Sequence, residues 1–156
     1  MSTLREFDEN YKQIIVGVDE AGRGPLAGPV VAAAVIIIQY FKELEEINDS
    51  KKLTEKKREQ LFELIIEKCV VGIGIADEKE IDEINILNAT FSAMRRAIKK
   101  VNEKTAFDIV LVDGNYKIRE YNGKQEAVIK GDGKSLSIAA ASIVAKVTRD
   151  RMLVEM

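Results

Sequence analysis

Two adjacent carboxylates near the start of the chain are the residues with the clearest chemical content. Residues 14–18 are apolar and rich in β-branched side chains, which is typical of a buried strand, and Asp19 and Glu20 follow directly. Neighbouring side chains of a regular strand point to opposite faces, so both acids serve one site only if the chain bends there. The alternative interpretation is a strand that ends in a solvated acidic turn.

Glycines beyond the two acids allow such a bend. Gly22 and Gly24 flank Arg23, so the backbone can turn sharply and a ligand can approach it closely. A guanidinium group suits the geometry of a phosphate. The turn therefore predicts a contact between Arg23 and an anionic ligand.

Two more acids occupy similar positions later in the chain. Asp113 lies near the end of the apolar run 108–114, and Asp132 stands between two glycines after a short strand expected at residues 127–130. If the run at 108–114 is a sheet neighbour of the first strand, Asp113 arrives beside Asp19 at the carboxyl edge. Open α/β sheets carry their sites at this edge.

Four carboxylates brought together would raise one another's pKa and resist joint ionisation. A hard divalent cation removes this conflict, and the absence of histidine favours Mg²⁺ or Mn²⁺ over zinc. Two such ions are a known means of cleaving phosphodiesters. The predicted catalytic and metal-binding residues are therefore Asp19, Glu20, Asp113 and Asp132.

Basic and hydroxyl side chains close to these acids are candidate phosphate contacts. They are Arg23, Ser50, Lys51, Lys134 and Ser135. For Asp49 and Ser50, local capping or turn chemistry is the alternative interpretation.

Composition narrows the class of protein. The 156 residues are 46% hydrophobic and 32% charged, which predicts one soluble domain over residues 1–156. The lack of histidine excludes Ser-His-Asp and Cys-His catalysis, and Cys69 lies in an apolar run that favours a structural thiol. The net charge of −2 argues neither for nor against a nucleic-acid partner.

The polar first 13 residues do not form a signal peptide, and the longest apolar run, 29–38, is too short to span a bilayer. We therefore expect a cytoplasmic protein without a membrane partner.

Two partial nucleotide-binding patterns fail. The glycines at 72 and 74 lack the remaining glycine of a dinucleotide site, and a P-loop ending at Lys134 and Ser135 would need a glycine where Val128 stands.

Hydrophobic periodicity predicts alternating strands and helices, and therefore an α/β fold. The expected strands are 14–18, 29–38, 69–76, 108–114 and 127–130, and the expected helices are 55–68, 81–101 in one or two pieces, and a last one from Ser135 or Ser137 to Met156. For the helix at 55–68 we expect Thr54 as N-cap and an inner stripe of Leu61, Phe62, Ile65 and Ile66.

Five sequence blocks, taken together and in this order, resemble bacterial ribonuclease HII. They are DEAGRGPLAGP at 19–29, NDSK at 48–51, VDGN at 112–115, VIKGD at 128–132 and AASIVAKVTRD at 140–150. The resemblance implies an RNase H-like fold with a five-stranded mixed sheet flanked by helices.

The resemblance also implies an activity: hydrolysis of RNA in RNA/DNA hybrids and incision at single ribonucleotides in duplex DNA, leaving 3′-hydroxyl and 5′-phosphate ends. By position, Asp19, Glu20 and Asp113 resemble metal ligands and Asp132 the fourth carboxylate. The turn Gly22-Arg23-Gly24 is similar to the element that senses the 2′-hydroxyl, and Asp49, Ser50, Lys51 and Lys130 fit phosphate-facing roles.

Members of the family usually continue beyond the last block into a segment with a Lys-Gly-Tyr motif, so this chain is expected to be short at its C-terminal end. We expect a monomer. Two alternatives to the nuclease remain: a hybrid-binding module without turnover, and a folding fragment that associates with itself.

Overall fold

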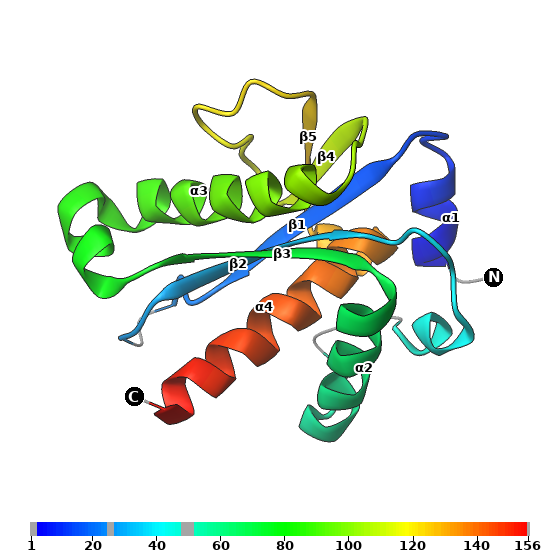
Figure 1. Ribbon diagram of the computed structural model, residues 1–156, viewed down its shortest axis with the longest axis horizontal. Helices are drawn as coiled ribbons and strands as arrows, with labels where there is room; N and C mark the ends of the chain where they lie inside the picture. The colour runs from blue at the N-terminus through cyan, green and yellow to red at the C-terminus, as the bar shows by residue number, and fades with distance from the viewer. Residues whose placement is uncertain (1–2, 25–26, 48–51, 156) are drawn as a thin grey trace.

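A five-stranded mixed sheet forms the centre of the protein (Figure 1). The computed structural model describes residues 3–24, 27–47 and 52–155. In chain order, the elements are α1 (Thr3–Glu9), β1 (Ile15–Ala21), β2 (Val30–Ile36), η1 (Lys42–Glu46), α2 (Glu55–Lys68), β3 (Val70–Ala76), α3 (Glu78–Lys104), β4 (Ile109–Asp113), β5 (Gln125–Val128), η3 (Gly131–Gly133) and α4 (Leu136–Glu155).

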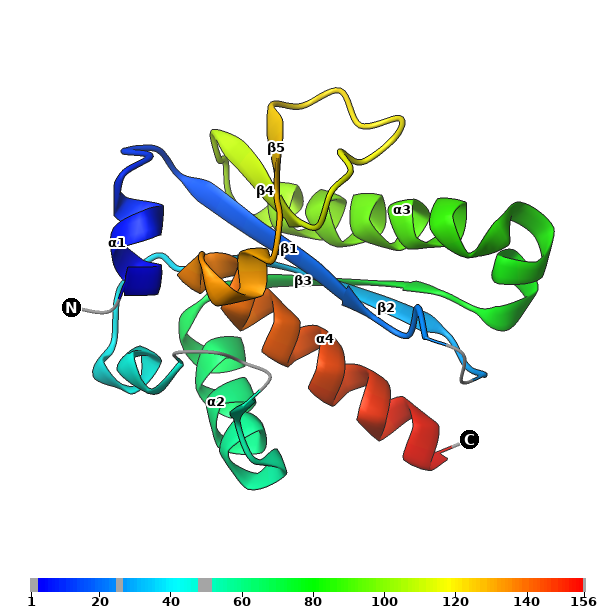
Figure 2. The same cartoon turned by 180° about the vertical axis from the view of Figure 1, so that it is seen from behind.

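The strand order is β3-β2-β1-β4-β5. β2 pairs antiparallel with β1 and with β3, whereas β4 runs parallel to β1 and to β5. One apolar core lies between the sheet and α3, and a second lies between the sheet and α2 with α4 (Figures 1 and 2). The predicted mixed sheet flanked by helices is therefore confirmed.

Glycines in the strands let the helices approach the sheet closely. A Cβ atom at Gly17 of β1 would lie 2.2 Å from the carbonyl carbon of Ser137 in α4. A Cβ atom at Gly74 of β3 would lie 2.0 Å from the carbonyl oxygen of Ala93 in α3. The glycine pair in β3 thus serves helix packing, consistent with its rejection as a nucleotide site.

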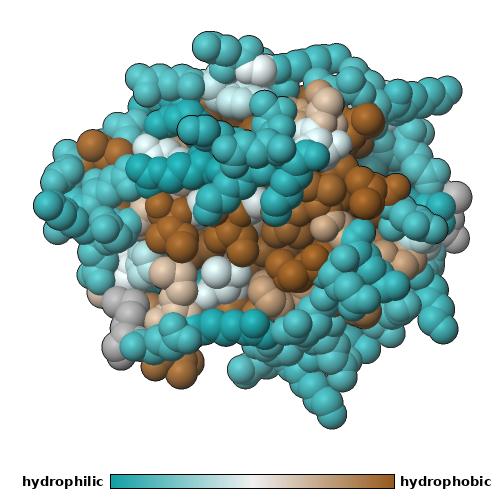
Figure 3. Space-filling model, viewed as in Figure 1, coloured by the Kyte–Doolittle hydropathy of each residue, from teal (hydrophilic) through white to brown (hydrophobic). Residues whose placement is uncertain are grey.

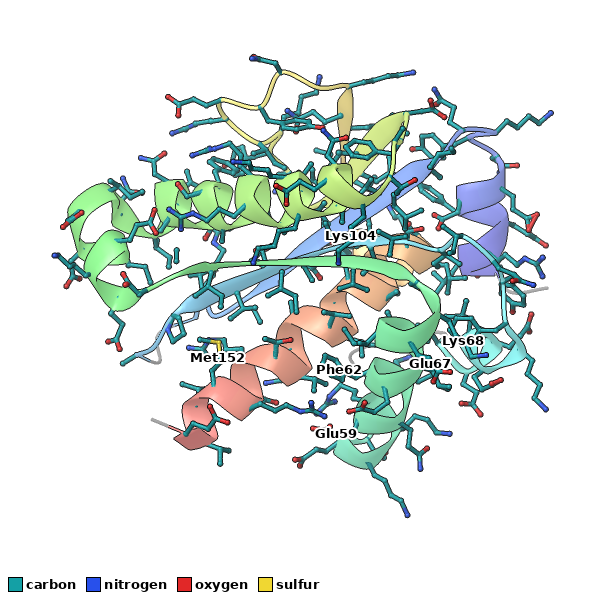
Figure 4. The ribbon with its side chains drawn as sticks, viewed as in Figure 1. Glu59, Phe62, Glu67, Lys68, Lys104 and Met152 are labelled. Carbon is teal, nitrogen blue, oxygen red and sulfur yellow. The ribbon has the colours of Figure 1, made fainter. Side chains whose placement is uncertain are left out.

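Helix α2 has the predicted N-cap, because the Thr54 side chain accepts a hydrogen bond from the Lys57 amide. One residue of its predicted inner stripe is wrong: Ile66 is 41% exposed. The stripe that packs on α4 is narrower, with Phe62 facing α4 in Figure 4 and Arg151 of α4 stacked 4.5 Å from the centre of its ring.

Helix α3 is longer than expected and consists of two pieces, as its sequence pattern allowed. Asp77 caps its first residues, and Asn85 breaks the helix with a φ of 70°. The break changes the direction of the chain near the end of the sheet where β1 leads to β2 (Figure 1). Gly22, Gly28 and Ile86 line one cavity there.

Helix α1 was not predicted from the sequence. It lies beside the first turn of α4 (Figure 2), where Asp8 accepts hydrogen bonds from the Ser135 hydroxyl and from the amide and hydroxyl of Ser137. Asp8 therefore caps a helix that begins 128 residues later in the chain, at Leu136.

Across the ranges 3–24, 27–47 and 52–155, the structure has no helix with the length and apolarity needed to cross a membrane.

Candidate functional site

The register of the parallel strands brings two acids to the same edge. The last residue pair between β1 and β4 is Val18 with Val112, so Asp19 and Asp113 are the next residue on each strand. The neighbouring strands expected from the sequence are thus confirmed. β5 extends the edge, and just beyond it the Asp132 amide donates a hydrogen bond of 3.2 Å to Oδ1 of Asp113.

The strand stays regular at the two acids, and the chain turns beyond them, at one of the two glycines expected to allow a bend. β1 continues through Glu20 and Ala21, which pair with Ala32 and Val31 of β2. The turn comes at Gly22, where φ is +104°. The physical reason is that β2 extends past the end of β4 and supplies β1 with backbone partners there.

Burial dominates the electrostatics of the acids. Asp19 is only 5% exposed, and desolvation raises its pKa well above the ordinary value, with further upward contributions from Glu20 and Asp113. Burial also raises the pKa of Glu20, although Asp19 and Arg23 oppose that shift. The pKa of Asp113 is raised by burial and then by Asp132. The carboxylates therefore lie close to one another, and the positive charge of Arg23 does not balance their burial and mutual repulsion.

One oxygen in this group makes no hydrogen bond. Oε2 of Glu20 is buried without a partner, while Oε1 lies 3.8 Å from Arg23. A buried carboxylate oxygen without a donor is costly, and a hard cation is the ligand that would satisfy it. The donor chemistry of Asp19, Glu20, Asp113 and Asp132 thus fits Mg²⁺ or Mn²⁺. In the arrangement seen here, no three acidic or cysteine side chains of the described segments form a group ready to hold a metal ion.

Arg149 of α4 holds the end of the turn that leads into β2. Its Nε donates to the carbonyl of Pro29 at 2.8 Å, and its Nη2 donates to the carbonyl of Ala27 at 3.2 Å. A Cβ atom at Gly22 would lie 2.4 Å from Nε, and one at Gly28 would lie 3.1 Å from Nη2. The two glycines leave room for this buried guanidinium.

Sequence reasoning had assigned no role to Arg149. The signal that could have revealed it is an arginine on the mostly apolar side of the last helix, within residues 140–150. Arg149 and Pro29 are 120 positions apart in the sequence, so periodicity alone cannot predict their contact.

The predicted phosphate contacts are only partly brought to the edge. Lys130 is exposed and adopts a left-handed backbone with φ of 54°, directly before Asp132 and its flanking glycines. Lys134 is also exposed. Ser135 is fully buried, and its hydroxyl donates to Asp8, so its geometry opposes the predicted phosphate contact. Asp49, Ser50 and Lys51 lie outside the described residues.

Comparison with known proteins decides the family. The model of the ribonuclease HII family matches residues 16–156. This chain belongs to the ribonuclease HII family. Membership places it among the ribonucleases H, which are endoribonucleases.

Two curated relatives named ribonuclease HII are bacterial. The protein of Fusobacterium nucleatum is 64% identical over 151 residues, and the match covers 94% of this chain and 69% of that relative. The protein of Acetivibrio thermocellus is 59% identical over 151 residues, with coverage of 96% and 57%. The chain therefore spans somewhat more than half of the length of the second relative.

Solved structures share the fold. An RNase HII from Archaeoglobus fulgidus, solved in complex with PCNA, is 29% identical with a TM-score of 0.73, covering 91% of this chain and 75% of that one. Bst-RNase HIII in complex with Mn²⁺ is 18% identical with a TM-score of 0.79, covering 91% and 53%. At that identity the second comparison supports the fold alone.

Proposed function

We propose that this chain is a metal-dependent endoribonuclease that hydrolyses RNA in RNA/DNA hybrids and incises 5′ to single ribonucleotides in duplex DNA. The products are 3′-hydroxyl and 5′-phosphate ends. The observation that carries the proposal is the group of buried and half-buried carboxylates at the shared edge of β1 and β4, in a member of the ribonuclease HII family.

Asp19, Glu20, Asp113 and Asp132 are the residues that would hold the metal. Two Mg²⁺ or Mn²⁺ ions bound there would supply an activated water and stabilise the leaving oxygen. Strand pairing holds Asp19 and Glu20 at this edge. Asp19 is only 5% exposed, so little water can compete for its carboxylate. Charge on these groups becomes favourable once cations balance it.

Arg23 and its two glycines are proposed to read the ribose. Arg23 is 44% exposed on its side chain and lies 3.8 Å from Glu20, so it stands between the acids and solvent. A backbone turn next to the reacting phosphate can hydrogen-bond a 2′-hydroxyl, which distinguishes RNA from DNA. Asp49, Ser50, Lys51, Lys130 and Lys134 are proposed to contact phosphates.

The test uses a DNA duplex with one embedded ribonucleotide and, in parallel, an RNA/DNA hybrid, each with Mg²⁺ or Mn²⁺. We expect incision of both substrates, and no incision of the same duplex made entirely of DNA. Equal cleavage of the all-DNA duplex would contradict the proposed reading of the 2′-hydroxyl.

A hybrid-binding module without turnover is the second candidate. It is favoured by one observation: in the described segments, the acids do not form a ready metal-binding group. Tight binding of the hybrid without cleavage at saturating Mn²⁺ would support this candidate over the nuclease.

We propose that the protein acts as a monomer in the cytoplasm and folds as one domain over residues 1–156. A concentration-independent mass and a single cooperative unfolding transition are the expected results.

A further inference from the structure

A cavity of about 400 Å³ lies beside the acids, on the side of the turn that faces α2 and α4. Glu20 and Gly22 form one wall of this cavity. Arg58 of α2 and Lys146 and Arg149 of α4 line the other side. Its size suits a small polar group, and its lining carries three positive side chains and one negative side chain, that of Glu20.

The charge of Arg149 has no ion-pair partner in the part of the chain that the structure describes. The residue is 7% exposed, and the hydrogen bonds found for its guanidinium go to the carbonyls of Ala27 and Pro29. A buried cation satisfied only by neutral acceptors is costly. An anion in the cavity would supply the missing counter-charge.

The other two cations can also turn to an anion. Arg58 donates from Nη1 to the carbonyl of Leu53 at 2.6 Å, and no ion pair to a described carboxylate is found for it. Lys146 pairs with Asp150 on the same helix at 3.2 Å, and the two side chains are 51% and 41% exposed. Exposed pairs of this kind contribute little to stability, so Lys146 can exchange its partner for a stronger anion.

The opposite side of the turn has a different charge. A second cavity of about 320 Å³ is lined there by Glu78 and Asp82, together with Arg23 and its neighbours. A polyanion that lies across the turn is therefore attracted towards the α2 and α4 side and repelled from the α3 side.

We propose that the cavity between the turn, α2 and α4 is a phosphate subsite, occupied by a backbone phosphate next to the phosphodiester that is cleaved. Arg58 and Lys146 donate hydrogen bonds to this phosphate, and Arg149 provides a fixed positive charge behind it. The inference rests on the proposed nuclease function and adds to it the direction in which the substrate strand leaves the acids.

The first test measures hybrid binding and cleavage for the variant Arg58→Ala with Lys146→Ala. Binding is measured with EDTA present, over a series of salt concentrations. We expect the slope of log K against log[salt] to become less negative by about 0.9 for each lost phosphate contact. In cleavage assays with Mn²⁺, KM rises several-fold and kcat changes less than KM does.

The matched control is Lys99→Ala, which removes one exposed charge from α3, away from the cavity. This control retains the salt slope and the KM of the unchanged protein. If the double variant behaves like the Lys99→Ala control, the phosphate subsite is wrong.

A second probe separates the subsite from the nuclease. Inorganic phosphate is added to the metal-free protein, and the side-chain Nε–H resonances of Arg58 and Arg149 are followed by NMR. We expect both to shift, and less so in Lys146→Ala. If the protein neither binds nor cleaves the hybrid while these resonances still shift, the proposed function fails and the anion site remains. If phosphate shifts neither resonance, the subsite is overturned.

Discussion

At the scale of single residues, the carboxylates at the sheet edge oppose the stability of the metal-free fold. Burial raises the pKa of Asp19, Glu20 and Asp113, and Oε2 of Glu20 has no hydrogen-bond partner. Side chains that destabilise the metal-free protein and become favourable when they bind a cation are typical of functional sites. A substitution that removes one of these carboxylate charges should therefore lower activity without lowering the stability of the metal-free protein.

The first prediction concerns Asp113→Asn. In EDTA, the variant should unfold at a temperature equal to or above that of the unchanged protein. It loses the charge repulsion with Asp132 and with Asp19, while an amide oxygen can still accept the Asp132 N–H. Calorimetry measures this, with Glu67→Gln on the exposed side of α2 as the control. A clear loss of stability in EDTA would show that the carboxylate has a structural role.

The second prediction concerns Asp8, whose pKa is raised by burial although the hydroxyls of Ser135 and Ser137 lower it in part. Because the folded state favours the protonated form, this contribution to stability is complete below the unfolded pKa of about 4 and is lost as the pH rises through the folded pKa. Relative to Asp8→Asn, the unchanged protein should lose unfolding free energy over that interval. Urea unfolding at a series of pH values measures the unfolding free energy of both proteins. If the unchanged protein gained unfolding free energy relative to Asp8→Asn as the pH rises, the prediction would be wrong.

At the scale of elements, glycines at helix crossings set the distance between α4 and the edge that carries the acids. Ser137 of α4 crosses β1 at Gly17, two residues before Asp19. The same helix carries Arg149, which holds the turn after β1. The position of the candidate site therefore depends on how closely one helix packs on one strand.

The third prediction follows from this crossing. Gly17→Ala would place a methyl group 2.2 Å from the backbone of Ser137, so we expect a loss of roughly 1–3 kcal/mol or more in unfolding free energy. Gly133→Ala is the matched control, since its added Cβ atom has no heavy atom within 4 Å. Denaturant unfolding compares the two, and equal stabilities would mean that the crossing is less tight than described.

The elements differ in how far the sequence predicts them. The apolar runs of β1, β2, β3 and β4 reveal buried strands, because both faces of the sheet are covered by helices. The acids Asp19 and Asp113 follow from the ends of those runs. Helix α1 escapes prediction because Leu4 is its only residue classed as buried, and because its main polar contact reaches Ser135 and Ser137 far along the chain. Local patterns carry no information about such contacts.

At the scale of the whole molecule, β3 is an edge strand with apolar side chains around it. Figure 3 shows a hydrophobic band across this face. Ile75 of β3 is 39% exposed. Cations from α3 cover part of the strand's backbone: Lys104 donates to the carbonyl of Val71 at 2.7 Å, beside β3 in Figure 4, and Arg96 donates to the carbonyl of Ile75 at 2.7 Å. Charged side chains on an edge oppose pairing with another sheet.

The fourth prediction is that these two cations keep the protein monomeric. Arg96→Ala combined with Lys104→Ala should produce a mass that increases with protein concentration, because two edge carbonyls and the apolar band become available. Analytical ultracentrifugation measures this, with Lys99→Ala as the control for lost charge. An unchanged monomer mass would show that the edge is protected in another way.

The central claim is that the acids at the joint edge of β1 and β4 form the metal-dependent centre of a ribonuclease. The most direct measurement is cleavage of a DNA duplex with one embedded ribonucleotide, in Mg²⁺ or Mn²⁺, with an EDTA control and with Asp113→Asn in parallel. We predict incision 5′ to the ribonucleotide that is abolished by EDTA and reduced by at least about 100-fold in the variant, the order of effect expected when a group that stabilises transition-state charge is lost. Full cleavage by a folded Asp113→Asn protein would contradict the claim.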